Sequence, residues 1–233
     1  MRILIVGASS GLGRALFDGL ATAGHDTIGV SRTVPAGVEA GRWIPADFAD
    51  PAHAADTVVA QLRGPIDAVI YNLGVWEPTA FTDEYDFTAQ DDATTLNLIA
   101  TNVSGPILLL QRLMPALLQS DRPRVILTGS TSGLPRSGRP EVAFGASKTA
   151  LNGIADALRT HYRADRLAVT TLQLGYLNTD DALEVPRAEA AARGEGSLIP
   201  VHDVVDVVRT ALGLSSAAYV REIVLPAILD ERF

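Results

Sequence analysis

The sequence predicts a single α/β domain over residues 1–233, with helices on both faces of a doubly wound parallel sheet of about seven strands. Short β-branched runs alternate with longer segments of helical period along the whole chain, which is typical of βαβ units. The 233 residues are 47% hydrophobic, enough to bury the core of one domain. No internal repeat, low-complexity tract or linker interrupts the alternation.

The N-terminal half begins with the clearest βαβ unit. Arg2–Val6 is apolar through its centre, as expected for a strand covered on both faces. A helix is expected over Gly13–Ala23, ended by Gly24, whose lack of a side chain suits the position after a helix. Asp50 is a typical cap for a helix over Pro51–Leu62, because proline is well suited to a first helical position. The other strands of this half are expected at Thr27–Ser31, Arg42–Pro45 and Ala68–Tyr71.

The C-terminal half is dominated by two long helices. Apolar residues recur at helical spacing between Asp91 and Leu118, with Pro106 as a candidate kink, and a second long helix is expected over Val142–Tyr162. The segment 184–197 is rich in Ala, Glu and Gly, so we expect a mobile lid over a site near 180–199. The remaining elements are strands at Val125–Thr128, Val169–Leu174 and Glu222–Pro226 and a helix at Asp203–Leu212.

The charge of the chain argues against several classes of partner. Its 19 basic and 27 acidic residues give a net charge of -8, which disfavours nucleic acid and anionic membrane surfaces. No stretch approaches the roughly 18–20 unbroken apolar residues of a membrane-spanning helix. The apolar run after Met1 is too short for a signal peptide. We therefore expect a cytoplasmic protein with a small-molecule partner.

Metal and thiol chemistry are not expected. Cysteine is absent, and the four histidines are far apart in sequence, so no metal site is predicted. Two pairs of carboxylates, Asp91-Asp92 and Asp180-Asp181, adjoin expected helix starts. Such pairs are more simply helix caps than the acid and base of a glycosidase.

A glycine-rich turn follows the first strand and opens the first helix. Glycines there allow a tight turn and let backbone N–H groups approach a pyrophosphate at the helix N-terminus. The position between strand and helix favours a dinucleotide site over an ordinary tight turn. The candidate binding residues are Gly7, Ser9, Ser10, Gly11, Leu12 and Gly13.

With the spacing GxxxGxG in this turn, the sequence resembles the short-chain dehydrogenase/reductase family over about residues 3–228. Asn72-Leu73-Gly74 resembles the family's Asn-x-x-Gly loop with one residue fewer, and Asn102 matches its mid-helix asparagine. Ser130 falls on the active serine, and Phe144 to Lys148 on the Tyr-x-x-x-Lys pair. The resemblance implies a Rossmann-type fold and a nicotinamide cofactor. It adds, as further cofactor contacts, the adenine pair Asp47 and Phe48 and the loop residues Gly175, Leu177 and Thr179.

Phe144 is the main departure from the family pattern. In the family the tyrosine supplies a proton to the carbonyl oxygen, and a phenyl ring cannot, which costs about 10² to 10⁴ in rate. Leu174 in place of proline affects only loop rigidity. Lys148, by contrast, is the one lysine beside 18 arginines, which indicates that an ammonium is needed there, the alternative being a solvated helix residue.

Other groups could replace the missing phenol. Ser130 can hydrogen-bond a carbonyl oxygen, and a water ordered by Asn102 and Ser130 is the favoured proton donor. Tyr176 is an alternative, although it is more simply interpreted as a packing aromatic, and Thr131 and Tyr71 are weaker candidates.

The end of the second strand indicates the cofactor. An NAD site favours an acidic residue there, whereas this chain has Ser31 and Arg32, with Arg14 as a possible assistant. Arg32 can pair with a 2′-phosphate, so NADP(H) is favoured over NAD(H), against the alternative of an ordinary exposed arginine.

Two functions remain open. The first is an oxidoreductase that acts on a small carbonyl or alcohol with weakened or rerouted proton transfer; the second is a catalytically silent NADP(H)-binding protein, such as a redox sensor or supporting subunit. A homodimer or homotetramer is also expected, because the family commonly pairs through its long helices. Burial within the monomer is the competing explanation for the apolar run Val103, Ile107, Leu110 and Met114.

Overall fold

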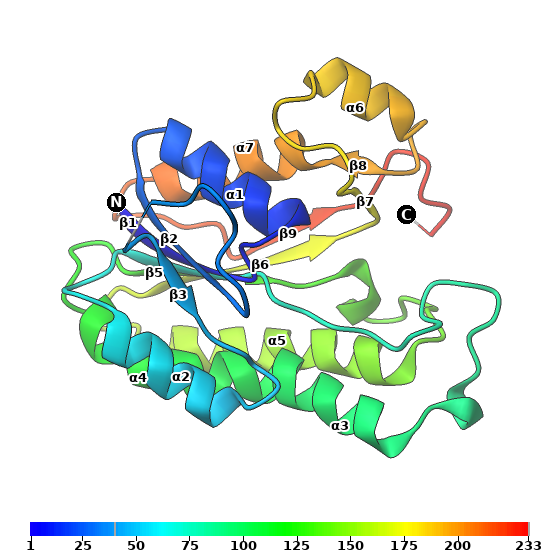
Figure 1. Cartoon of the computed structure of the whole chain (residues 1–233), viewed down its shortest axis with the longest axis horizontal. Helices are drawn as coiled ribbons and strands as arrows, with labels where there is room; N and C mark the ends of the chain where they lie inside the picture. Colours follow the sequence, from blue (N-terminus) through cyan, green and yellow to red (C-terminus); the bar gives the residue numbers. More distant parts are fainter. Residues whose placement is uncertain (40, 233) are drawn as a thin grey trace.

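The computed structural model describes residues 1–39 and 41–232, which form three layers (Figure 1). A seven-stranded sheet has the order β3-β2-β1-β4-β5-β6-β9, and every pairing in it is parallel. This confirms the predicted doubly wound fold. The sheet consists of β1 (Arg2–Val6), β2 (Asp26–Ser31), β3 (Trp43–Pro45), β4 (Ala68–Tyr71), β5 (Arg124–Thr128), β6 (Ala168–Leu174) and β9 (Glu222–Leu225).

Helices cover both faces of the sheet. Figure 1 shows α1 and α7 on one face and α2, α4 and α5 on the other. Alternate residues of β1 serve the two cores, since Ile3 and Ile5 pack toward α1 whereas Leu4 and Val6 pack toward α4. The helices are α1 (Gly11–Thr22), α2 (Pro51–Gln61), α3 (Asp92–Ile99), α4 (Gly105–Leu117), α5 (Val142–His161), α6 (Arg187–Arg193) and α7 (Val201–Gly213).

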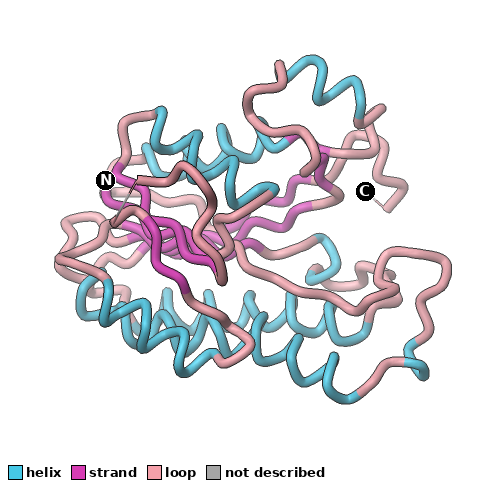
Figure 2. The backbone as a smooth tube through the Cα atoms, viewed as in Figure 1, coloured by secondary structure: helices cyan, strands magenta, loops and turns pink. Residues whose placement is uncertain are grey.

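The strand order reverses beside β1, and this positions a site. The chain winds outward from β1 through β2 to β3, then returns to β4 on the other side of β1. Open parallel sheets bind ligands beyond the carboxyl ends of the strands at such a switch point. Figure 2 shows long loops gathered at that end of the sheet.

The long helix predicted over Asp91–Leu118 is present, but its irregularity lies before Pro106. A π-helical segment, η2 (Ala100–Ser104), joins α3 to α4. Pro106 has no N–H to donate to the carbonyl of Asn102, so the regular hydrogen-bond ladder cannot run through this turn. Tyr71 Oη donates to the carbonyl oxygen of Thr101 at 2.8 Å, which uses one of the carbonyl groups in the segment.

The segment 184–197 contains a helix that the composition did not indicate. It carries α6, and the short strand β8 (Ile199–Pro200) after it pairs with β7 (Leu177–Asn178). Asn178 Nδ2 donates to Asp181 Oδ2 at 2.8 Å and to the Ala190 carbonyl oxygen at 3.1 Å. The mobility of this lid stays a prediction.

The two carboxylate pairs differ in their roles. Asp91 caps α3, because its side chain accepts from the N–H of Thr94 at 2.7 Å, as predicted. The prediction for the other pair is wrong, since Pro186 is the residue before α6 and Asp181 instead accepts from Asn178 and Arg193.

The continuous helical stretch Asp92–Leu117 is long and apolar enough to cross a membrane by length and composition alone. Part of it lies in the core, where Leu110 and Met114 are buried, whereas Leu96 and Ile107 are exposed. The apolar run predicted for oligomer contacts is therefore divided between the core and the surface.

Candidate functional site

A cleft of about 890 Å³ lies beyond the carboxyl ends of the strands. Its walls are the turn after β1 and the loops after β2, β3, β4, β5 and β6. All the predicted site residues line this cleft except Gly13 and Asn102, which lie directly behind its wall. The lining residues among them are Gly7, Ser9, Ser10, Gly11, Leu12, Ser31, Arg32, Asp47, Phe48, Asn72, Leu73, Gly74, Ser130, Phe144, Lys148, Gly175, Leu177 and Thr179.

The glycine turn has no room for side chains at two positions. Gly7 has a φ of +82°, and a Cβ there would lie 2.9 Å from the backbone of Leu73. A Cβ on Gly13 would overlap the carbonyl oxygen of Gly7. These close approaches hold the turn against the β4 loop and bring the start of α1 to the cleft.

The first turn of α1 has N–H groups available for an anion. Ser10 occupies the cap position, but its side chain makes no capping hydrogen bond. The first N–H groups of a helix have no partner within the helix, and the helix dipole favours negative charge there. This arrangement fits a pyrophosphate group.

The end of β2 holds Ser31 in place and leaves Arg32 exposed. Ser31 Oγ donates to the Thr33 carbonyl oxygen at 2.7 Å and accepts from Trp43 Nε1 at 3.0 Å. Within residues 1–39 and 41–232, Arg32 has no ion pair or side-chain hydrogen bond, whereas Arg14 Nε pairs with Asp18 Oδ2 at 2.5 Å. Arg32 is therefore the freer of the two cations.

The adenine pair predicted after β3 is half exposed and half buried. Asp47 is exposed, and its Oδ1 accepts from the N–H of Ala49 at 3.0 Å. Phe48 is only 2% exposed and packs edge-on against Tyr71, with ring centroids 5.8 Å apart. The Phe48 side chain thus belongs to the core beneath the cleft.

Lys148 is buried on α5, with 6% of its surface exposed. Its Nζ donates to the Thr128 carbonyl oxygen at 3.0 Å, and no carboxylate in the described chain lies within ion-pair distance. Burial lowers the pKa of Lys148 to about 8. The ammonium group therefore has no ion-pair partner among the described residues.

Asn102 fixes the β4 loop to α5. Its Nδ2 donates to the Val75 carbonyl oxygen at 2.7 Å and to Ser147 Oγ at 3.0 Å, and its Oδ1 accepts from the Val75 N–H at 2.9 Å. Because the amide already makes these contacts, a water ordered by Asn102 would use its backbone carbonyl group. Ser130 Oγ accepts from the N–H of Ser132 at 3.1 Å, which leaves its hydroxyl hydrogen for a further acceptor.

An aromatic cluster lines the cleft. The ring of Phe81 lies 5.1 Å from Phe144, 5.9 Å from Tyr176 and 6.1 Å from Trp76, measured between centroids. Tyr176 Oη accepts from Arg139 Nη1 at 2.8 Å. Tyr71 does not belong to this cluster: its hydroxyl is buried against Thr101, and burial raises its pKa, so it is not a proton donor for the cleft.

Two buried carboxylates that the sequence did not indicate hold the start of α5. Glu77 Oε1 accepts from the N–H groups of Ala143 at 3.1 Å and Phe144 at 3.2 Å. Glu141 Oε1 accepts from the N–H of Phe81 at 3.0 Å. Both contacts join residues about sixty positions apart, so no local pattern reveals them. Together they position Phe144 and Phe81.

Metal ligation has no support among residues 1–39 and 41–232, where no group of three or more His, Cys, Asp or Glu side chains could hold an ion. A glycine cradle at a helix start, a free arginine at the end of β2 and a buried lysine on α5 are instead features of a dinucleotide-binding α/β domain. Residues 1–190 match the family model for short chain dehydrogenase, and the chain belongs to this family of oxidoreductases.

Individual proteins that are similar to this chain share less than a third of its residues. The chain is 28% identical over 214 residues to dehydrogenase/reductase SDR family member 7B of Bos taurus, covering 82% of this chain and 62% of that protein, so it spans less than two thirds of that relative's length. It is 28% identical to an NADPH-dependent pterin aldehyde reductase of Arabidopsis thaliana, covering 76% and 75% of the two chains. A 3-oxoacyl-[acyl-carrier protein] reductase from Brucella melitensis has the same fold, with a TM-score of 0.78, 21% identity and coverage of 96% and 94%.

Proposed function

We propose that this chain is an NADP(H)-dependent oxidoreductase that acts on a small carbonyl or alcohol and whose proton does not come from residue 144. The observation that carries the proposal is the ammonium of Lys148, which is buried at the cleft and has no ion-pair partner among the described residues. Burying an unpaired ammonium costs free energy. Such a group is retained where a ligand's hydroxyl groups complete its hydrogen bonds.

The residues at the cleft fit a nicotinamide dinucleotide. The N–H groups of the α1 turn would hold the pyrophosphate, Asn72 to Gly74 would line the adenosine side, and Lys148 would donate to ribose hydroxyl groups. The fit rests on the glycine turn, where a side chain at Gly7 or Gly13 would collide with the backbone that shapes the cradle. When bound, this cofactor supplies or accepts a hydride.

Arg32 supports a preference for NADP(H). Its free guanidinium group lines the cleft at the end of β2, where a 2′-phosphate would form paired hydrogen bonds with it. The Arabidopsis thaliana relative is named for its NADPH dependence. Neither Ser31 nor Thr33 offers the carboxylate that a ribose 2′-hydroxyl group favours.

Proton transfer is rerouted in this proposal. By resemblance, Phe144 stands where relatives have a tyrosine, and its ring has no hydrogen to donate. Ser130 would orient the carbonyl oxygen through its free hydroxyl hydrogen. Water then supplies the proton. Without a side chain positioned as general acid, the reaction is slower than in a site that has one.

The test combines binding with turnover. Fluorescence titration of the purified chain with NADPH and NADH measures affinity, and oxidation of NADPH with a panel of aldehydes and ketones measures activity. We expect tighter binding of NADPH than NADH, with slow turnover of at least one carbonyl compound. Failure to bind either dinucleotide would refute the whole proposal.

A specific observation favours the second function, a silent NADP(H)-binding protein. Phe81 packs edge-on against Phe144 and Tyr176 at the wall of the cleft, beside residue 144, where a substrate would lie. Tight NADPH binding with no turnover of any carbonyl compound, also after Phe81→Ala, would favour this alternative. Turnover that appears only in Phe81→Ala would indicate that the ring obstructs a functional site.

We also propose that the chain forms a homodimer or homotetramer. Leu96 and Ile99 on α3 and Ile107 on α4 expose apolar side chains, which a second copy would cover. Multi-angle light scattering measures the mass in solution. A monomer at micromolar concentration contradicts this proposal, and a charged residue at Ile107 should dissociate the oligomer. The cytoplasmic location expected from the sequence stays a prediction.

A further inference from the structure

A second cleft, of about 660 Å³, lies at the amino ends of the strands, opposite the nucleotide cleft. It is formed where β5 and β6 begin, below the ends of α5 and α7 and the chain that leads into β9. We propose that this cleft binds a small anion with more than one negative charge, of the phosphate class. The proposal does not depend on the oxidoreductase function.

The charge around this cleft is opposite to that of the chain. Six arginines line it, namely Arg122, Arg124, Arg159, Arg163, Arg166 and Arg221, together with two carboxylates, Asp121 and Asp156. Six positive and two negative charges leave four positive charges, in a chain whose net charge is -8. Like charges that converge on one cleft repel each other, and a bound anion removes the repulsion.

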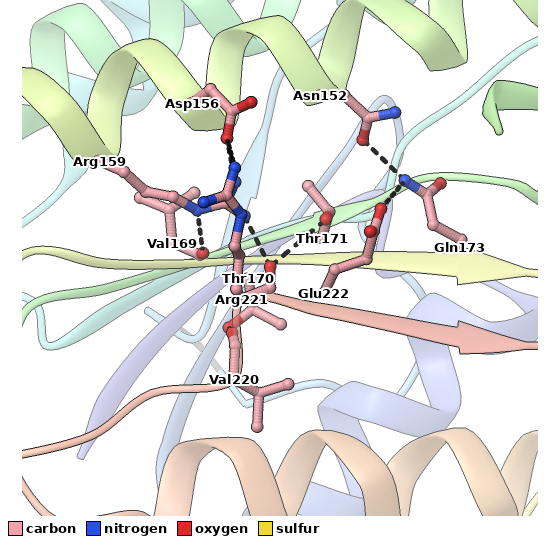
Figure 3. Close-up of polar contacts among 10 residues, drawn as sticks. All are labelled: Asn152, Asp156, Arg159, Val169, Thr170, Thr171, Gln173, Val220, Arg221 and Glu222. Atoms are coloured by element: carbon pink, nitrogen blue, oxygen red, sulfur yellow. Dashed lines mark hydrogen bonds and ion pairs between the residues drawn. The ribbon is translucent and has the colours of Figure 1, made fainter. Parts of the chain in front are cut away.

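One carboxylate serves two of the arginines. Asp156 Oδ1 accepts from Arg159 Nη1 and from Arg221 Nη2, both at 2.7 Å (Figure 3). Arg159 Nη2 also donates to the Arg221 carbonyl oxygen at 2.6 Å, and its Nε donates to that of Val169 at 2.9 Å. These contacts fix the wall of the cleft and still leave an excess of one positive charge in this group of three.

Arg124 is buried without a counter-charge. It is 5% exposed, and its Nη2 donates to the Leu214 carbonyl oxygen at 2.6 Å, where α7 has just ended. Its Nε has no hydrogen-bond partner, and no carboxylate of the described residues lies within ion-pair distance. A buried guanidinium that is bonded only to carbonyl oxygens keeps its full charge, so it adds to the positive potential of the cleft.

Arg163 and Arg166 carry charges with no structural use. Neither side chain has a hydrogen bond or ion pair to any described residue, and both are exposed on the turn between α5 and β6. Arg166 has a φ of +58°, a left-handed conformation that costs free energy for a residue other than glycine. The Arg166 N–H donates to the Arg163 carbonyl oxygen at 3.2 Å and closes this turn. The closed turn holds both arginine side chains at the cleft.

The chemistry of the lining selects phosphate. Guanidinium groups bind phosphate oxygens through paired hydrogen bonds, and several of them can share one multivalent anion. The volume lies within the range of small-molecule sites. The chain's negative charge elsewhere disfavours a nucleic acid or an anionic membrane. A free polyphosphate or a phosphorylated metabolite is the occupant that remains.

The test uses inorganic pyrophosphate, and orthophosphate as the arm with less charge, in calorimetric titrations of the full chain at low salt. The double variant Arg163→Gln/Arg166→Gln removes the two free cations. Both side chains are exposed, so we expect the fold to be kept, and circular dichroism checks this. Arg32→Gln/Arg112→Gln removes the same charge elsewhere, including the candidate phosphate contact of the nucleotide cleft.

Besides any binding at the α1 turn, we expect a saturable pyrophosphate site that weakens at least tenfold in Arg163→Gln/Arg166→Gln and less than twofold in the control, with orthophosphate weaker than pyrophosphate. Equal weakening in both double variants would reveal a general charge effect and overturn the proposal. Loss confined to the control would place the anion in the nucleotide cleft, and absence of saturable binding would mean that the arginines are structural; either result overturns it too. NADPH titration of the same variants reports the nucleotide cleft separately.

Discussion

The ammonium of Lys148 lies against the ring of Phe144, with Nζ 5.5 Å from the ring centroid. The two residues are one helical turn apart on α5, so they share a face, and Nζ is held by the Thr128 carbonyl oxygen. An ammonium at this distance is attracted by the electrons of the ring. Residue 144 therefore lies close to the positive charge of Lys148. If residue 144 carried a phenol hydroxyl group, this charge would favour loss of the phenol proton.

Phe144→Tyr should therefore raise carbonyl reduction by about 10² to 10⁴, since it supplies a general acid beside a cation. The Phe144 ring, which would carry the added hydroxyl group, lies in the aromatic cluster at the cleft wall. The measurement is kcat/KM with NADPH and the best carbonyl substrate found for the parent chain.

The control is Phe144→Tyr combined with Lys148→Met, which keeps the phenol and removes the charge. The gain should then be largely lost. An unchanged rate in the single variant, with NADPH binding intact, would mean that the chain already has an efficient donor elsewhere.

Much of this site follows from local sequence patterns. The cradle is a strand, a glycine turn and a helix within Arg2–Thr22, and Lys148 is marked by being the one lysine. Phe81, Glu77 and Arg139 could not be predicted, because loops bring them to the cleft through contacts with residues far away in sequence. The π-helical segment η2 follows from Pro106, because the hydrogen bond that this proline cannot donate is missing one turn earlier in the helix.

The buried Lys148 predicts a dependence of stability on pH. Burial lowers its pKa to about 8, whereas in the unfolded chain it stays protonated to about pH 10.5. Between these values the unfolded state binds more protons than the folded state, so Lys148 makes the free energy of unfolding rise with pH, by up to roughly 3 kcal/mol. Urea unfolding from pH 7.5 to 10.5 measures this.

Lys148→Met isolates that contribution, because the other titrating groups are common to both chains. The parent should gain stability relative to the variant as the pH rises. A difference that is flat or of opposite sign would show that Lys148 has an ordinary pKa in the folded chain.

Arg32→Ala should weaken NADPH binding about tenfold to a hundredfold and leave NADH binding nearly unchanged, because hydrogen bonds to a charged phosphate contribute about 1.5–3 kcal/mol. Arg14→Ala is the matched control: its guanidinium group is already paired with Asp18, so we expect a smaller effect. Equal loss of both dinucleotides in Arg32→Ala would mean that Arg32 does not contact the 2′-phosphate.

The glycine turn provides the sharpest test of the cradle, since its geometry depends on the absence of a side chain. A Cβ on Gly13 would overlap the Gly7 carbonyl oxygen, and the Gly7 backbone is held in place, because its N–H is bonded to the Val30 carbonyl oxygen at 2.8 Å. Gly13→Ala should lower the free energy of unfolding by about 2 kcal/mol or more and abolish dinucleotide binding.

Gly153 also lies in a helix, but a Cβ there meets nothing within 4 Å. Gly153→Ala should therefore stabilise the chain by about 0.5–1 kcal/mol and leave binding intact. Dinucleotide binding that survives Gly13→Ala would show that the phosphates lie away from this turn.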